Sequence, residues 1–101
     1  MKGVGDFSKN NYAGRNFYYG IREHGMGAIL NGMAFYGLHT VSGSTFLVFS
    51  GYMMGSVRVA ALSGLPVSYI WTHDSIGVGE DGATRLPRAP LAAVRALAAV
   101  R

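Results

Sequence analysis

The feature that most constrains the fold is a succession of two apolar segments with a helix-like segment between them. Residues 45–49 form a continuous apolar run of strand length, and residues 67–71 form a second segment typical of a buried strand. Residues 53–62 predict a helix, closed by Gly64 and Pro66. Two buried strands joined by a helix are typical of parallel sheets. We therefore predict an α/β fold, an incomplete parallel sheet with flanking helices.

A further helix is predicted over residues 22–36. Its apolar side chains recur at spacings of three and four, the period of a helix. Three glycines inside this segment, Gly25, Gly27 and Gly32, indicate that another backbone or a ligand comes close. The remaining segments are predicted as a loop at 1–16, a short strand at 17–19, a turn-rich connection at 37–44, a loop at 72–82 and an Ala-rich helix at 91–101.

Composition excludes several classes of protein. Half of the 101 residues are apolar and 14% are charged, which argues against disorder. The absence of cysteine excludes disulfides and thiolate metal sites. The formal net charge of +4 comes largely from a basic tail, without a basic stripe, so we expect no nucleic-acid binding. The first ten residues lack a signal peptide's apolar core, and every apolar run is too short for a membrane span. We expect a cytoplasmic protein.

Two short motifs are rejected on physical grounds. Residues 77–82 match the glycine pattern of a dinucleotide site, but Glu80 and Asp81 would repel the phosphates. Pro87 also denies the helix that such a site needs. Adjacent residues of a helix point about 100° apart, so a Glu–His pair at 23–24 does not suit one metal. The histidines lack zinc spacing, and no metal site is predicted.

The remaining candidate residues have ordinary structural interpretations. Glu23 in a first helical turn is favoured by the helix dipole and can simply be a solvated carboxylate. Phe46, Phe49 and Tyr52 follow an apolar strand and can be core aromatics. The residue pattern by itself leaves both interpretations open.

Three longer blocks resemble the transketolase family. They are GIREHGMGAILNGMA (20–34), TFLVFSGYM (45–53) and THDSIGVGEDG (72–82), which follow one another in family order at near-family spacing. Residues 6–20 are similar to the family's lead-in. The resemblance implies that residues 1–101 are part of a thiamin-diphosphate-binding pyrimidine domain. Within it, residues 1–16 are a loop lead-in and residues 83–101 a divergent, basic, Ala-rich tail.

The family's chemistry implies roles for the first two blocks. Transketolases are transferases of carbohydrate metabolism, in the pentose phosphate pathway, that move a two-carbon ketol unit between sugar phosphates. They use thiamin diphosphate and a divalent metal, magnesium or calcium. By resemblance, Glu23 is the catalytic glutamate that hydrogen-bonds the cofactor's pyrimidine. Phe46, Phe49 and Tyr52 match the aromatic positions that pack on that ring.

The third block implies substrate contacts, and the residues after it depart from the family. His73 matches a catalytic and substrate-binding histidine, and Asp81 matches a residue that contacts a sugar hydroxyl. Arg85 then stands where the family has histidine, and Ala89 where it has glutamate.

The chain resembles only part of the family's length, which limits what we expect of it alone. The diphosphate and its metal would be held by a domain absent from this chain, so only the cofactor's pyrimidine end would be bound here. The implied partner is another transketolase-like chain or a diphosphate-domain subunit, in an oligomer, and we expect the chain alone to be inactive. The alternatives are a non-catalytic α/β interaction module and a relic derived from a transketolase. The sequence does not separate a split-gene subunit from a truncation.

Overall fold

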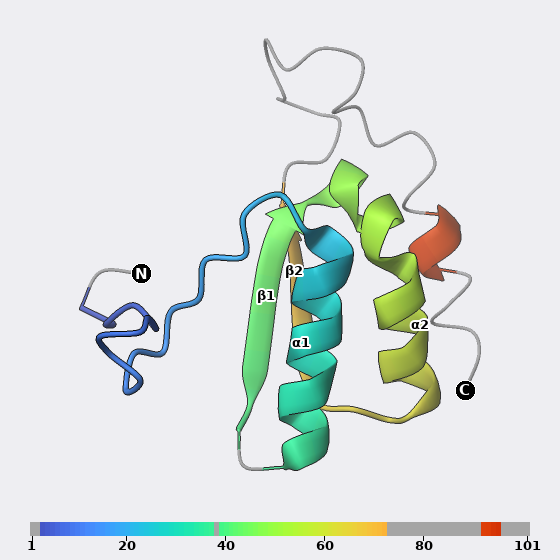
Figure 1. Ribbon diagram of the computed structural model, residues 1–101. Helices are drawn as coiled ribbons and strands as arrows, with labels where there is room; N and C mark the ends of the chain where they lie inside the picture. The colour runs from blue at the N-terminus through green and yellow to red at the C-terminus, as the bar shows by residue number, and fades with distance from the viewer. Residues whose placement is uncertain (1–2, 38, 73–91, 96–101) are drawn as a thin grey trace, which may run out of the picture.

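The computed structural model describes residues 3–37, 39–72 and 92–95, and these form a small sheet with helices on one face (Figure 1). The order is α1 (Glu23–Tyr36), β1 (Val41–Phe46), the 3-10 helix η1 (Leu47–Met53), α2 (Met54–Leu62) and β2 (Val67–Thr72). The two strands pair in parallel, with register running from Val41 opposite Val67 to Phe46 opposite Thr72. The predicted α/β fold with a parallel sheet is confirmed.

Helix α1 begins and ends where the sequence predicts. Gly37 ends it in the left-handed conformation, at φ 82°, and donates its N–H to the carbonyl of Ala34. Of its internal glycines, Gly27 does lie against another element, because a Cβ there would come within 2.7 Å of the Ser56 Cβ. At Gly32 no atom of the described residues comes within 4 Å, so no neighbouring backbone accounts for that glycine there.

The strand predicted at 45–49 is misplaced. β1 begins at Val41, within the segment predicted as a connection, and ends at Phe46. Leu47 onward winds instead into η1, where the buried Ser50 donates its hydroxyl to the carbonyl of Leu47 at 2.6 Å. That local bond offers the backbone an alternative to a sheet ladder. The pairing register described for β1 and β2 ends at the pair of Phe46 and Thr72.

The short strand predicted at 17–19 is also absent. The lead-in, residues 3–20, folds on itself through backbone bonds such as Phe7 N–H to Asn16 O and Arg15 N–H to Gly5 O. Phe17 stacks on Phe7 at 4.6 Å between ring centroids. Among the described residues, 17–19 have no neighbouring strand and take part in no sheet ladder.

The helix predicted at 53–62 and the strand at 67–71 are confirmed as α2 and β2, each within one residue at either end. The predicted stop holds as well: Gly64 has φ 61°, and its N–H bonds the carbonyl of Ala61. Residues 92–95 form a single helical turn within the predicted terminal helix. Residues 73–91 and 96–101, which include the predicted loop after Thr72 and the rest of the tail, lie outside the described residues.

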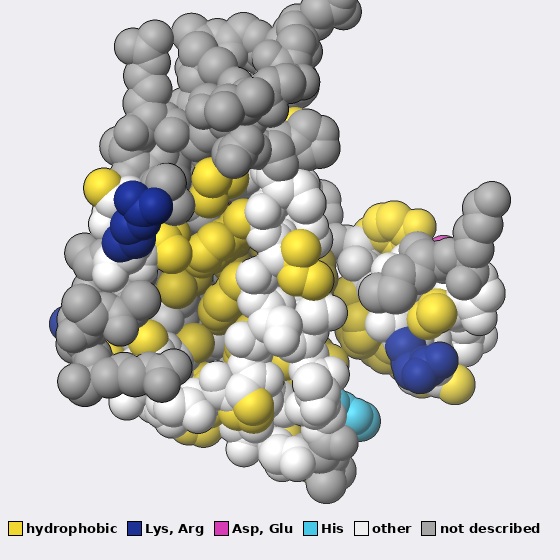
Figure 2. Space-filling view, turned by 180° about the vertical axis from the view of Figure 1, so that it is seen from behind, with side chains coloured by type: hydrophobic (Ala, Val, Ile, Leu, Met, Phe, Trp, Pro, Cys, Tyr) yellow, Lys and Arg dark blue, Asp and Glu magenta, His cyan; other side chains and the backbone are white. Residues whose placement is uncertain are grey.

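The core lies between α1, α2 and one face of the sheet. Its buried apolar side chains are Met26, Leu30, Ala34, Val41, Met53 and Val57. β2 alternates, with Val67, Tyr69 and Trp71 packed on this core and Ser68, Ile70 and Thr72 exposed. Seen from behind, hydrophobic side chains gather in the middle of the molecule (Figure 2). The face of the sheet away from the core carries exposed and mostly polar side chains, Ser42 and Ser44 on β1 and Ser68, Ile70 and Thr72 on β2.

A buried polar chain crosses the core and joins three elements. Asn31 on α1 is 6% exposed and donates its side-chain N–H to the carbonyl of Ser56 on α2, at 2.8 Å. Tyr69 on β2 donates its hydroxyl to the Asn31 Oδ1 at 2.6 Å. Burial raises the pKa of Tyr69. The asparagine is satisfied from both sides, so its burial costs little and fixes how the helices sit on the sheet.

Candidate functional site

The predicted site residues that are described lie at the carboxyl end of the strands. Figure 1 shows that α1 starts, β1 and β2 end, and η1 lies at this end of the molecule. Glu23 is the first residue of α1, and η1 carries Phe49 and Tyr52 directly after β1. In open α/β sheets, ligands bind in crevices at this end of the strands. The fold therefore places at one end of the sheet residues that are up to 29 positions apart in sequence, Glu23 and Tyr52.

Glu23 is half-buried and stands where free backbone N–H groups favour a negative charge. The guanidinium of the preceding residue, Arg22, donates a hydrogen bond to the carbonyl of Tyr19 at 3.0 Å. It is therefore bonded to the lead-in. Among the described residues, Glu23 makes no salt bridge. Its carboxylate can therefore meet a ligand's hydrogen-bonding group rather than a structural cation.

Phe46, Phe49 and Tyr52 form a row, which we call the aromatic row. The rings of Phe46 and Phe49 are stacked, 5.8 Å apart and 8° from parallel. Phe49 and Tyr52 are 6.2 Å apart and tilted by 30°. Tyr52 is 71% exposed, whereas both phenylalanines are half-buried. The row is thus a partly open surface, and the core-aromatic interpretation is wrong for Tyr52.

The other two predicted site residues, His73 and Asp81, lie outside the described residues, as do Arg85 and Ala89. The last described residue before them is Thr72, which pairs with Phe46 at the end of the sheet. No group of three or more His, Cys, Asp or Glu side chains suited to a metal occurs in the described part of the chain. No helix of that part is long and apolar enough to cross a membrane.

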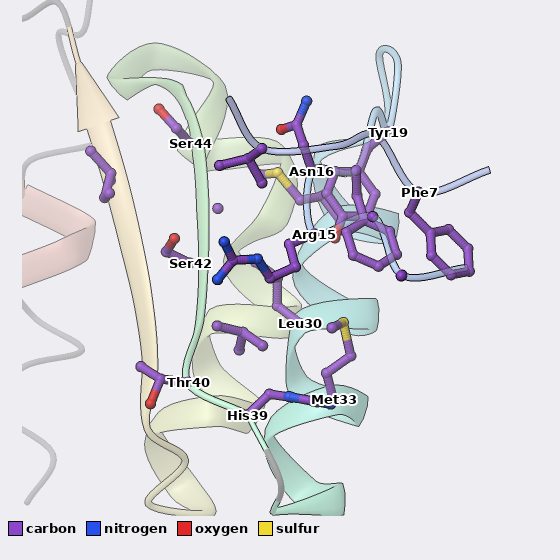
Figure 3. A pocket seen from close by; sticks show the side chains of 18 of the residues that line it. Phe7, Arg15, Asn16, Tyr19, Leu30, Met33, His39, Thr40, Ser42 and Ser44 are labelled. Atoms are coloured by element: carbon purple, nitrogen blue, oxygen red, sulfur yellow. The ribbon is translucent and has the colours of Figure 1, made fainter. Parts of the chain in front are cut away.

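A separate cavity of about 790 Å³ lies beside β1, between the lead-in and α1 (Figure 3). Its wall includes the rings of Phe7, Phe17 and Tyr19, with Ser42 and Ser44 of β1 opposite. Neither Glu23 nor any member of the aromatic row lines it. This cavity is lined by aromatic and polar side chains, but the predicted carboxylate is not among them. We therefore keep the carboxyl end of the sheet as the candidate site.

Comparison of this chain with known proteins shows which family it belongs to. The model of the transketolase pyrimidine-binding domain matches residues 1–101. The chain belongs to the transketolase family. The Bacillus subtilis transketolase is 55% identical over 97 residues, covering 96% of this chain and 14% of that protein. The Dictyostelium discoideum transketolase is 61% identical over 82 residues, covering 81% of this chain and 12% of that protein.

Solved transketolase structures have the same fold over this segment. A crystal structure of the Pichia stipitis transketolase in complex with sedoheptulose 7-phosphate superposes with a TM-score of 0.90 at 48% identity. The superposition covers 96% of this chain and 15% of the Pichia stipitis chain. The transketolase from Leishmania mexicana gives a TM-score of 0.89 at 50% identity, over 93% of this chain and 14% of its own. The chain therefore spans about one seventh of the transketolases that it matches.

The residues of the candidate site fit one end of thiamin diphosphate. A first-turn carboxylate and a flat aromatic surface suit the hydrogen-bonding edge and the face of a pyrimidine. The diphosphate end needs a hard cation with oxygen ligands. The described residues hold no side-chain cluster of that kind.

The sequence reasoning missed one part of this end of the molecule. Ser56 on α2 contacts His24, which is next to Glu23, through its hydroxyl at 3.0 Å. The two residues are 32 positions apart, and no local pattern links them. The available signal was Gly27, whose missing side chain lets α1 and α2 approach closely.

Proposed function

We propose that this chain supplies the pyrimidine half of the thiamin-diphosphate site of a transketolase-type transferase. The observation that carries the proposal is the position of Glu23. It begins α1 at the same end of the sheet as the aromatic row, in a chain that the pyrimidine-domain model matches throughout. The whole chain then forms part of one pyrimidine domain, with residues 83–101 as its divergent tail.

In this proposal, Glu23 holds a proton at the cofactor's pyrimidine. Glu23 is half-buried in the first turn of α1, and its carboxyl group can share a hydrogen bond with a ring nitrogen of the pyrimidine. The cofactor, when bound, supplies the electron sink for the transferred two-carbon unit.

The aromatic row orients the pyrimidine and keeps water from it. Phe46 and Phe49 present stacked, half-buried rings, and Tyr52 adds an exposed face at the edge. An aromatic contact of this kind contributes about 0.5–1.5 kcal/mol beyond its buried area. The row therefore contributes position and exclusion of water rather than charge.

The remaining parts of the site are proposed from the family. His73 and Asp81 would contact the sugar-phosphate substrate in the loop that follows β2. The diphosphate and its magnesium or calcium ion would be held from outside these 101 residues. The partner would be another transketolase-like chain or a diphosphate-domain subunit in a cytoplasmic oligomer.

One experiment tests this function in two arms. In the first, residues 3–72 replace the matching segment of the Bacillus subtilis transketolase, which leaves the divergent tail out. We expect the chimera to retain ketol transfer to within about tenfold. A folded chimera that binds no cofactor, or that binds it without turnover, would contradict the proposal and favour the non-catalytic module.

The second arm titrates the isolated chain with thiamin diphosphate and magnesium by calorimetry. One aromatic contact and one neutral hydrogen bond together provide about 2–3 kcal/mol. A millimolar dissociation constant already corresponds to about −4 kcal/mol. We therefore expect binding weaker than millimolar. A micromolar constant would show that the chain completes its own site, and it would contradict the assignment of the diphosphate end to a region outside it.

A further inference from the structure

The first turn of α1 is tied to α2 through one serine. Ser56 is 3% exposed, and its Oγ lies 3.0 Å from the carbonyl oxygen of His24 and 3.0 Å from Nδ1 of the same residue. Both distances are within hydrogen-bonding range. A serine hydroxyl has one hydrogen to donate and lone pairs with which to accept. The oxygen must therefore play a different part in each contact.

Only one arrangement satisfies both contacts. The carbonyl of His24 can only accept, so the Ser56 hydroxyl donates its hydrogen there. Oγ is then an acceptor toward the ring, and Nδ1 must carry a hydrogen. In the opposite arrangement, the hydroxyl would donate to Nδ1 and leave two oxygens 3.0 Å apart with no hydrogen between them. That contact would be repulsive and costly at a nearly buried serine.

Two glycines make room for this contact. A Cβ at Gly55 would lie 3.1 Å from Cε1 of His24, which is tighter than ordinary van der Waals contact. A Cβ at Gly27 would lie 2.7 Å from the Cβ of Ser56, a distance that side chains do not tolerate. The ring and the serine therefore occupy a place that both helices leave open.

We propose that Ser56 is a positioning residue that fixes His24 in its Nδ1–H tautomer and anchors the first turn of α1. The neutral ring then keeps Nε2 as a hydrogen-bond acceptor. The same anchor sets the place of Glu23, the residue before His24, and this last step rests on the proposed function. The tautomer and the anchoring do not depend on it.

Long-range proton–nitrogen correlation spectra of the ¹⁵N-labelled chain test the tautomer directly. They are recorded at alkaline pH, where imidazole rings are neutral. Loss of one ring's signals in His24→Gln assigns His24 among the three histidines of the chain. We expect Nδ1 to resonate as a protonated, pyrrole-type nitrogen and Nε2 as a pyridine-type nitrogen. The reverse pattern would overturn the proposal.

Ser56→Ala and the control Ser63→Ala test the anchor. Ser63 is exposed just after α2, so the same hydroxyl is removed there without touching His24. In Ser56→Ala we expect the ring to lose its Nδ1–H preference. The amide of Met26, bonded to the Arg22 carbonyl at 2.8 Å, should exchange about tenfold faster. Ser63→Ala should change neither.

An unchanged ring pattern in folded Ser56→Ala would overturn the proposal, and so would an equal change in Ser63→Ala. If Ser56→Ala does not fold, the spectrum of the unsubstituted chain still decides the tautomer. The expected tautomer together with a Glu23 that proves dispensable would keep the anchor and reject the proposed function. The two failures are therefore distinguishable.

Discussion

Two neighbouring regions, the seam between α1 and α2 and the aromatic row, differ in how deeply their side chains are buried. In the seam, which we define as Gly27 and Asn31 of α1, Met53 at the end of η1 and Ser56 of α2, every residue is buried and each polar side chain has a partner. The row ends in Tyr52, which is 71% exposed. A side chain that contributes little to packing but stands at the ligand-binding end of a sheet points to binding. The seam therefore supports the fold, whereas the row is where we propose that the pyrimidine binds.

The largest expected effect on stability is at Met53, which is fully buried in the seam. Met53→Ala should lower the free energy of unfolding by about 2–5 kcal/mol, because it removes buried apolar surface and leaves a cavity. Urea unfolding measures the loss. The control is Met54→Ala, one residue along at a half-buried position. Equal losses in the two variants would break the distinction between the seam and its surroundings.

A smaller loss is expected at Asn31, the polar centre of the seam. Asn31→Ala should cost about 1–3 kcal/mol, since it leaves the Ser56 carbonyl and the Tyr69 hydroxyl without their partner. Asn10→Ala, an exposed amide in the lead-in, is the matched control and should be nearly neutral. A neutral Asn31→Ala would mean that water replaces the missing amide and that the network is not structural.

Tyr69 on β2, which donates its hydroxyl to Asn31 of the seam, makes the stability of the fold depend on pH. Burial raises its pKa above the unfolded value of about 10, so the folded state favours the neutral phenol. The resulting stability is fully present below about pH 10 and is lost as the pH rises through the folded pKa. Tyr69→Phe should remove part of this alkaline loss. Because burial also raises the pKa of Tyr19, the comparison is made in a Tyr19→Phe background. An unchanged alkaline slope would contradict the role of Tyr69.

The smallest effect on stability is expected in the row. Tyr52→Ala should change the free energy of unfolding by less than about 0.5 kcal/mol, as should Tyr12→Ala in the lead-in, because both rings are exposed. In the chimera, Tyr52→Ala should weaken thiamin-diphosphate binding by about tenfold, whereas Tyr12→Ala should not. Equal effects of the two on binding would remove Tyr52 from the site.

The sequence predicted the elements whose signal is local. The three-and-four spacing located α1, and Gly64 with Pro66 located the end of α2. β1 was misplaced because its residues, VSGSTF, lack the continuous apolar run of a buried strand. The apolar run itself became η1, where Ser50 bonds its own backbone. Residues 17–19 form no strand because no neighbouring strand pairs with them among the described residues. A local sequence pattern does not contain information about such a pairing partner.

Resemblance selected the site residues, and only the structure related them in space. Residue patterns alone left open whether Glu23 is an ordinary first-turn carboxylate and whether the aromatics belong to the core. The parallel register explains why the start of α1 and the end of β1 lie at one end of the sheet. The contact between Ser56 and His24 depends on how two helices pack, so it was beyond any spacing rule.

The most direct test of the central claim is Glu23→Gln in the chimera that carries residues 3–72. The change keeps the size of the side chain and replaces its ionisable carboxyl group with a neutral amide. Ketol transfer should fall at least about 100-fold while the protein folds and assembles normally. Asp6→Asn, the same chemical change at an exposed acid in the lead-in, should leave the rate near that of the unsubstituted chimera. Near-normal turnover by folded Glu23→Gln would contradict the assignment of this carboxyl group to the pyrimidine site.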